Sequence, residues 1–370
     1  MTAGPLAPDT STGRSAARRL ADFPDRRNSL NALRLALAVL VIVSHAWPLG
    51  RFGNDPRLGA LTLGEVAVAG FFAISGWLIT QSRLSGGLAG YAWRRFVRIY
   101  PGYVVALLAV AFLFAPLGAK ISTGTYGWRD GLHYVGVNLG LLINDYRVGT
   151  SLPASAHPAW NGSLWTLFSE ALCYAAIGLL VTACPRRVLP ALVVLAFLLA
   201  TLAHLTLPGD AVPFWLKDGL LLFPFFFAGA TLYVLRRYVP LNAPVAVGAL
   251  MLLAGVMATS VPMGLGALPI AYLVLWLGAA LPLQGMARRH DISYGMYIYA
   301  FPVQQILAIA GAAAWGVGPY AVLCVLATVP VAVASWFLVE RPAQQSRHWL
   351  DHPSGAAYGR THRPGTPPPG

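Results

Sequence analysis

Long apolar stretches recur along this sequence, and they constrain its fold more than any other feature. Each is about 17–25 residues long, enough for an α-helix to cross a hydrocarbon core of ~30 Å. Of the 370 residues, 57% are hydrophobic and only 11% are charged, too few charges for a soluble surface of this size. Ten such segments can be drawn, at residues 31–49, 62–82, 98–118, 163–183, 187–206, 217–236, 243–261, 266–283, 292–312 and 317–338.

A bundle of helices is the membrane architecture that these segments fit. In lipid, backbone polar groups are satisfied only in helices or in closed barrels. Barrel strands are about ten residues long and alternate in polarity, whereas these segments are longer and uniformly apolar. The sequence therefore predicts an all-α, polytopic membrane protein with about ten transmembrane helices.

The distribution of basic residues sets the expected orientation. A net charge of +13 could indicate a nucleic-acid partner. If the N-terminus is cytoplasmic, however, only six of the 26 Lys and Arg residues fall outside and the other 20 fall inside. This asymmetry is typical of plasma (inner) membrane proteins, so we attribute the surplus to topology and to anionic lipid headgroups and expect no nucleic acid. The six outer residues are Arg51, Arg57, Lys120, Arg129, Arg147 and Lys217.

The chain divides by composition into three parts. Residues 1–30 are polar and Arg-rich and predict a cytoplasmic N-terminal segment, residues 31–342 form one transmembrane domain, and residues 343–370 predict a disordered, Pro-rich cytoplasmic tail. Within the domain, residues 119–162 form a long outer loop. It contains a short apolar stretch typical of a re-entrant or interfacial helix. A binding wall and a floppy connector are both open for this loop.

Ionisable residues inside the apolar segments are the candidates for chemistry, because each costs roughly 2.5–3.5 kcal/mol to insert. Arg34, His45 and Glu170 lie within segments and Glu340 lies near an inner end. Arg34 and His45 are ~16.5 Å apart along one helix. His45 and Glu170 reach a similar depth in the outer third of the membrane, so neighbouring helices would let them hydrogen-bond.

A carboxylate beside an imidazole fixes the tautomer and raises the basicity of the ring. Such a histidine can take a proton from an alcohol and turn it into a nucleophile. The alternative is that His45 is a satisfied interfacial residue and that Arg34 snorkels to the membrane surface. The depth that Glu170 shares with His45 favours the pair.

Two further stretches have candidate roles. YAWRRFVRIYPGY, residues 91–103, places Arg94, Arg95 and Arg98 at the cytoplasmic end of the third segment. Guanidinium groups suit phosphates, although anchoring the helix is an equal alternative. GFFAISGWLIT, residues 70–80, contains small residues that allow close helix packing. The three cysteines show no ligand spacing, so no metal site is expected.

These stretches, taken in order, resemble the integral-membrane acyltransferase 3 family, which includes polysaccharide O-acetyltransferases. The resemblance is carried by NALRLALAVLVIVSH, AVAGFFAISGWLIT, WRRFVRIYPGY, NGSLWTLFSEALCY and SYGMYIYAFPV, with VERP closing the last segment. They extend from residue 31 to about residue 342. Each is weak alone, but five in the family's order are specific.

The resemblance implies ten helices, a cytoplasmic N-terminus, an acyl-CoA donor (usually acetyl-CoA) inside and an acceptor reached from outside. It implies that His45 is the catalytic histidine, that Arg34 belongs to the same motif, and that Glu170 is the glutamate of a tryptophan–glutamate motif. The arginines at 94, 95 and 98 match the motif assigned to acyl-CoA.

Two features depart from the family pattern. Many relatives have a histidine before the proline of the ninth segment, where this chain has Tyr299 and Ala300, so we assign that segment no catalytic role. Some relatives also have a C-terminal SGNH-type domain, which we do not expect beyond so short a tail.

The sequence therefore predicts a membrane-bound O-acyltransferase that uses acyl-CoA and a hydroxyl of a sugar, polysaccharide or related acceptor. The alternative hypothesis is a transporter or flippase of a polysaccharide precursor, with His45 and Glu170 as a proton relay. The arginine cluster and the spacing from Arg34 to His45 favour the enzyme, because a carrier needs no nucleotide-phosphate site.

Overall fold

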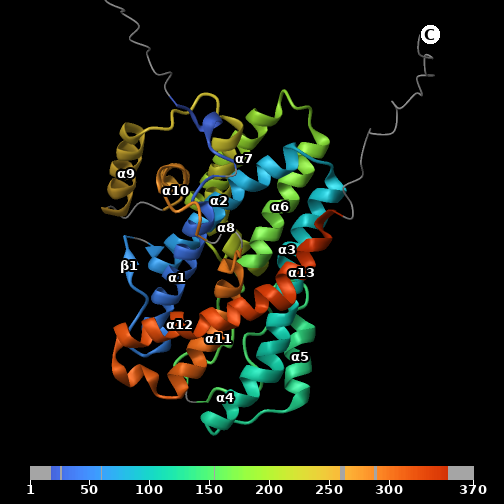
Figure 1. Ribbon diagram of the computed structural model, residues 1–370, viewed down its shortest axis with the longest axis vertical. Coiled ribbons are helices and arrows are strands. Elements are labelled where there is room, and N and C mark those ends of the chain that lie inside the picture. The colour runs from blue at the N-terminus through green and yellow to red at the C-terminus, as the bar shows by residue number, and fades with distance from the viewer. Residues whose placement is uncertain are drawn as a thin grey trace, which may run out of the picture. The chain divides into compact units, whose positions relative to one another are not determined.

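The computed structural model describes residues 18–25, 27–59, 61–153, 155–258, 263–286 and 290–348. Within these ranges the chain is almost entirely helical (Figure 1). The sheet found there is a hairpin of two-residue antiparallel strands, β1 (Arg57–Leu58) and β2 (Leu61–Thr62). The predicted all-α class is therefore confirmed.

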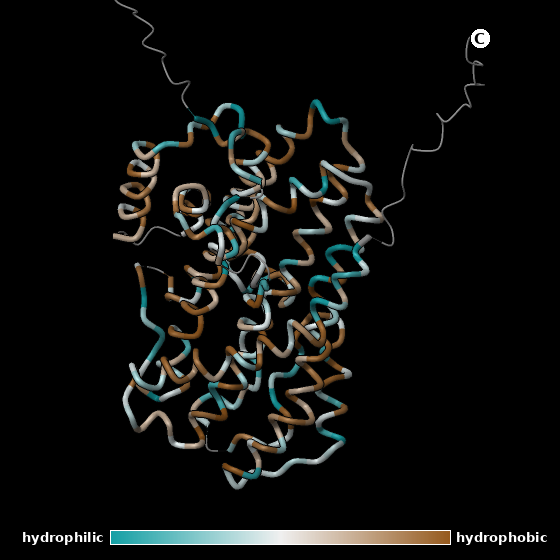
Figure 2. The backbone as a smooth tube through the Cα atoms, in the orientation of Figure 1, coloured by the Kyte–Doolittle hydropathy of each residue, from teal (hydrophilic) through white to brown (hydrophobic). Residues whose placement is uncertain are grey.

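Each of the ten predicted segments contains a helix. Among the described residues, seven helical stretches are long and apolar enough to cross a membrane, and Figure 2 shows hydrophobic residues along them and hydrophilic residues gathered in the connections. The chain is thus a polytopic membrane protein. The seven are α1 (Leu30–Leu49), α2 (Leu63–Leu84), the continuous stretch Leu88–Ile121, α6 (Thr166–Ala183), α7 (Leu189–Thr206), α8 (Phe214–Val234) and the continuous stretch Val317–Gln345.

The other three predicted segments contain shorter helices. These are α9 (Ala243–Ala258) with 16 residues, α10 (Ala267–Ala280) with 14 and α11 (Ser293–Ile309) with 17. A 3-10 turn, η3 (Met263–Gly266), precedes α10. All three helices fall below the roughly 20 residues of a typical span.

The third segment begins earlier than the sequence suggested. We expected a helix from residue 98, but α3 (Leu88–Ala109) begins ten residues before that and continues through the π-helical turn η2 (Val110–Phe114) into α4 (Ala115–Ile121). The predicted start was wrong because a segment drawn from hydropathy leaves out arginines, whereas an α-helix can contain them. Arg94, Arg95 and Arg98 therefore lie inside α3, which is hydrophilic in its first half and hydrophobic in its second (Figure 2).

The residues between α4 and α6 are held in place by hydrogen bonds. The expected short helix is α5 (Trp128–Asn138). The Asn138 amide donates to the Asp145 carbonyl at 2.8 Å, and the indole of the fully buried Trp160 donates to the Ser151 hydroxyl at 2.8 Å. We call residues 119–162 the outer segment from here on; its place outside the membrane is a prediction.

The chain separates into two compact units. The first contains the chain up to Ser44, Asp55–Thr80 and Arg186–Asp291, and the second contains His45–Asn54, Gln81–Pro185 and the chain from Ile292 on.

In the first unit, α2 and α8 approach backbone to backbone. A Cβ added to Gly76 would lie 1.9 Å from the Phe226 carbonyl oxygen, and one added to Gly229 would lie 2.1 Å from the Ala73 carbonyl oxygen. Only glycine permits this distance at either position. The prediction that small residues in 70–80 serve close packing is confirmed for Gly76.

In the second unit, α3 is the central helix and packs against α5, α6 and the end of the last span. That span consists of α12 (Val317–Ser335), the π-helical turn η5 (Trp336–Glu340) and α13 (Arg341–Gln345), followed by η6 (Ser346–His348). Helix α12 also pairs with α11 through a connection that includes η4 (Ala312–Trp315).

The chain ends extend beyond the apolar segments. At the N-terminal end, η1 (Leu20–Asp22) hydrogen-bonds through its backbone to Val239 and Arg236 in the first unit. At the other end, the Trp93 indole donates to the Ser346 carbonyl at 2.8 Å, so the first six residues of the predicted tail are ordered. Residues 1–17 and 349–370 lie outside the described ranges.

Candidate active site

The predicted catalytic histidine lies one turn before the end of α1. The His45 side chain is half-buried, and its ring packs edge-on against Phe301 of α11, with ring centroids 5.5 Å apart and an interplanar angle of 70°. Such a contact fixes the plane of the imidazole. A ring held in one plane can direct a nitrogen at one place, as a proton acceptor must.

Helix α11 connects this histidine to the outer segment. The Asn161 amide donates to the backbone of α11 at 2.9 Å, and the Gln305 amide donates to the Ala159 carbonyl at 2.7 Å. Phe301 and Gln305 are four residues apart and share a face of the helix. The face of α11 that packs on His45 therefore also holds the end of the outer segment.

Glu170 lies in the second turn of α6. Its Oε1 accepts a hydrogen bond from the Tyr174 hydroxyl one turn later. The start of α6 is tied to α11, because the Tyr297 hydroxyl shares a 2.7 Å hydrogen bond with the Thr166 hydroxyl and donates to the Ser163 carbonyl at 2.6 Å.

The predicted pair, His45 and Glu170, lies on two helices that share one neighbour. Each residue lies one turn from an end of its helix, and α11 contacts both of those ends. The contacts described for the two side chains are with Phe301 and Tyr174. A direct hydrogen bond between the imidazole and the carboxylate stays a prediction.

Arg34 forms an ion pair in the first unit. Its Nη1 lies 3.2 Å from Asp291 Oδ2, and the side chains are 21% and 16% exposed. The contact holds the guanidinium beside a carboxylate of the same unit, whereas snorkelling would direct it to lipid headgroups.

The three arginines of α3 face three different neighbours. A Cβ on Gly86 would lie 3.0 Å from Arg94 Nη2, so Arg94 lies against the turn between α2 and α3. Arg98 stacks over the Tyr294 ring of α11, with its guanidinium carbon 5.9 Å from the ring centroid. Arg95 lines a cavity between α3 and α6.

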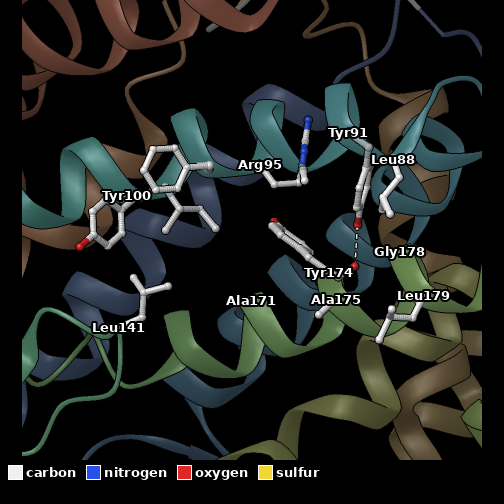
Figure 3. A pocket seen from close by; sticks show the side chains of 13 residues that line it. Leu88, Tyr91, Arg95, Tyr100, Leu141, Ala171, Tyr174, Ala175, Gly178 and Leu179 are labelled. Carbon is white, nitrogen blue, oxygen red and sulfur yellow. Dashed lines mark hydrogen bonds between the residues drawn. The ribbon is translucent and has the colours of Figure 1, made fainter. Parts of the chain in front are cut away.

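That cavity measures about 390 Å³ and is apolar over most of its wall (Figure 3). Tyr91 and Arg95 of α3 lie across it from Tyr174 of α6, and the Tyr91 hydroxyl donates to the Tyr174 carbonyl at 2.8 Å. The same Tyr174 donates its hydroxyl to Glu170. The cavity therefore extends from Arg95 of α3 to the turn of α6 that contains the candidate carboxylate. Its other lining residues are Leu88, Ala92, Phe96, Ile99, Tyr100, Leu141, Ala171, Ala175, Gly178 and Leu179.

Arg95 stands out among the polar groups of this cavity. Its buried Nε has no hydrogen-bond partner within the described part of the chain. A buried N–H group without an acceptor is costly. An anionic or strongly polar ligand group beside it would remove that cost.

Several partners of the site residues were not found by sequence reasoning. Tyr174 follows Glu170 by one helical turn, a spacing that could have indicated the pair. Asp291 and Phe301 are separated from Arg34 and His45 by more than 250 residues, and no local pattern connects them.

Glu340, which the sequence singled out only for its position, is 1% exposed. The Ser335 hydroxyl donates to its carboxylate at 3.0 Å. This places a buried acid in the π-helical turn η5, close to α3, because a Cβ on Gly102 would lie 3.6 Å from Glu340 Cγ. No group of three or more His, Cys, Asp or Glu side chains that could hold a metal ion occurs in the described ranges.

Known proteins match the chain in sequence over most of its length. The family model described as "Acyltransferase domain" (acyltransferase 3) matches residues 27–337. An "O-acetyl transferase" of Shigella phage Sf6 is 28% identical over 328 residues, covering 85% of this chain and 96% of that protein. "Nodulation protein 10" of Rhizobium leguminosarum bv. viciae is 28% identical over 364 residues, covering 87% of this chain and 94% of that protein. No solved structure matches the chain.

Proposed function

The chain belongs to the acyltransferase 3 family and is an integral-membrane acyltransferase. On that premise we propose its acyl donor and its acceptor. It moves an acyl group, specifically acetyl, from acyl-CoA on the cytoplasmic side of the plasma membrane to a hydroxyl of a carbohydrate acceptor at the outer face. The name of the Shigella phage relative supports transfer of acetyl to oxygen.

The cavity between α3 and α6 is the observation that carries the donor assignment. Its α3 wall extends from Leu88 to Tyr100, a rise of ~18 Å. An apolar cavity of that length suits an extended pantetheine arm and its acyl group. Arg95 supplies a guanidinium for a phosphate. Arg94 and Arg98 lie outside this cavity, against Gly86 and Tyr294, and we propose that they contact the nucleotide beyond it.

The transfer itself needs one base. His45 takes the proton from the acceptor hydroxyl, and the oxygen attacks the thioester carbonyl carbon. The C–S bond then breaks, the ester forms, and His45 returns the proton to the CoA thiolate. Glu170, held by Tyr174, stabilises the charged imidazole.

A covalent route also fits the same residues. In it, an imidazole nitrogen attacks the thioester carbonyl, the C–S bond breaks and the CoA thiolate takes the imidazole proton. The acceptor oxygen then attacks the acyl-histidine, the C–N bond breaks as the ester forms, and the imidazole recovers its proton from the hydroxyl. Radiolabelled acetyl-CoA without acceptor separates the routes, since only the covalent one leaves label on the protein.

The test is turnover of acetyl-CoA by the purified protein in nanodiscs, with release of free CoA as the readout. We expect His45→Ala to lower the rate by at least about 100-fold, the lower end for a lost general base. We expect CoA to raise the Tm of the wild type but not of Arg95→Ala.

The matched control is Arg187→Ala, an exposed arginine on the same predicted side, which should keep the CoA-dependent rise in Tm. A His45→Ala protein that releases CoA at the wild-type rate would refute the catalytic assignment. Folded wild type that neither binds CoA nor cleaves acetyl-CoA would favour the transporter.

A further inference from the structure

The outer segment contains a cavity, lined by both polar and apolar residues, that the donor site does not use. It measures about 450 Å³ and is lined by residues 144–147 and 157–159. A second cavity of about 280 Å³ shares Arg147 and Pro158 with it. The larger one falls in the range of known small-ligand sites, about 300–1,000 Å³.

Hydrogen-bond donors and acceptors are mixed in this cavity. Arg147 and His157 expose their side chains, and within the described ranges neither side chain has a hydrogen bond. Asp145 Oδ1 accepts from the Arg147 backbone N–H at 2.9 Å, which leaves Oδ2 to accept from a ligand. A hydroxyl group both donates and accepts, so the set suits a polyhydroxylated ring better than a simple anion or cation.

The wall of this cavity is tied to the catalytic histidine. Gln305 is fully buried, and its amide donates to the His157 carbonyl at 2.5 Å and to the Ala159 carbonyl at 2.7 Å. Phe301, one turn earlier on α11 and so ~6 Å away along the axis, packs on the His45 ring. One helix face thus sets the position of the cavity wall relative to the imidazole.

We infer that this cavity is an acceptor subsite that binds a sugar unit through Asp145, Arg147 and His157. The inference rests on the proposed function, because it gives the acceptor a place beside the base. A chain of sugars seated there extends along α11 toward His45. The unit held in the cavity differs from the unit that is acylated, so the subsite selects oligosaccharides over single sugars.

The test is binding of fluorescently labelled protein in nanodiscs to a printed array of bacterial oligosaccharides. We expect the wild type to bind a subset of them. Replacing both Arg147 and His157 by Ala should weaken that binding by about tenfold or more, since hydrogen bonds to a charged group are lost. Arg129→Ala is the control, because this exposed arginine of the same segment lies against Trp128, outside the cavity.

Two results would overturn the inference: a wild type that binds no glycan on the array, or a double variant that binds as the wild type does. Cleavage of acetyl-CoA that depends on His45, measured on the same preparation, reports separately on acyl transfer. If the protein cleaves acetyl-CoA but binds no glycan on the array, the subsite is rejected and the proposed function is not. Glycan binding that needs Arg147 and His157, without cleavage, supports the sugar site and rejects acyl transfer.

Discussion

The hydrogen bond from Tyr174 to Glu170 is the single contact that most directly supports the candidate carboxylate. Hydrogen bonds to charged groups contribute about 1.5–3 kcal/mol. We expect Tyr174→Phe to lower kcat for acetyl-CoA turnover by about tenfold with a smaller change in KM, because the ring that lines the donor cavity is kept and only the hydroxyl that binds Glu170 is lost. Kinetics of the purified variant measure both.

Tyr320→Phe is the control for this variant. It removes a buried hydroxyl that donates to the Gln304 carbonyl at 2.9 Å, so it costs similar stability away from Glu170. Equal losses of kcat in both variants would mean that Tyr174 acts only through the fold.

The ion pair between Arg34 and Asp291 gives a second prediction. Each partner is partly buried, so removing one leaves an unbalanced charge. Arg34→Gln and Asp291→Asn should each lower the free energy of unfolding by about 1–2 kcal/mol. The loss in the free energy of unfolding of the double variant should be about 1 kcal/mol smaller than the sum of the two single losses. Thermal unfolding of all four proteins in one lipid measures this, and strictly additive losses would contradict the coupling.

Sequence reasoning found the ionisable residues but not their partners. Arg34, His45 and Glu170 are conspicuous because charge inside an apolar segment is costly. Asp291 and Phe301 are not unusual in their local sequence, and only the folded chain brings them to Arg34 and His45. The three arginines of α3 read as one cluster in sequence, although the helix directs them to three neighbours.

Among the helices, the glycines between α2 and α8 make the sharpest prediction. A Cβ on Gly76 would lie 1.9 Å from a backbone oxygen of α8, and backbone cannot move aside as a flexible side chain can. Gly76→Ala should therefore destabilise the protein by about 1–3 kcal/mol or more. The Tm in nanodiscs measures the loss.

Gly248→Ala in α9 is the matched control, because a Cβ there meets no atom within 4 Å. It should leave the Tm unchanged or raise it slightly, since alanine favours a helix. Equal Tm values for the wild type and Gly76→Ala would contradict the close packing of α2 on α8.

Hydropathy found an apolar helix in all ten places, but it located helix starts less well. Helix α3 begins ten residues before the expected position because its first turns contain arginines, and α6 begins at Thr166, three residues late. Asn161 lies just before α6, and its amide donates to the backbone of α11 at 2.9 Å, a distant contact that no local pattern encodes.

For the molecule as a whole, the proposed reaction requires that the donor and acceptor sites open on opposite sides of the membrane. The native cysteines offer a direct test. Cys184, just after the end of α6, is partly exposed, whereas Cys173 and Cys324 are buried. Since Arg186 and Arg187 follow it, we expect Cys184 to be cytoplasmic. A membrane-impermeant maleimide should label it in inside-out vesicles and not in right-side-out ones.

The complementary variant replaces Cys184 by Ser and Arg129, in the outer segment, by Cys. It should show the opposite labelling, because α5 lies in the outer segment. If Cys184 were labelled from outside, the orientation would be reversed and the arginine-rich start of α3 would face away from the cytoplasm. Acyl-CoA could then not reach Arg95, and the reversed orientation would contradict the assignment of the donor site. Labelling as expected would place Arg95 on the donor side and Arg147 on the acceptor side, as transfer across the membrane requires.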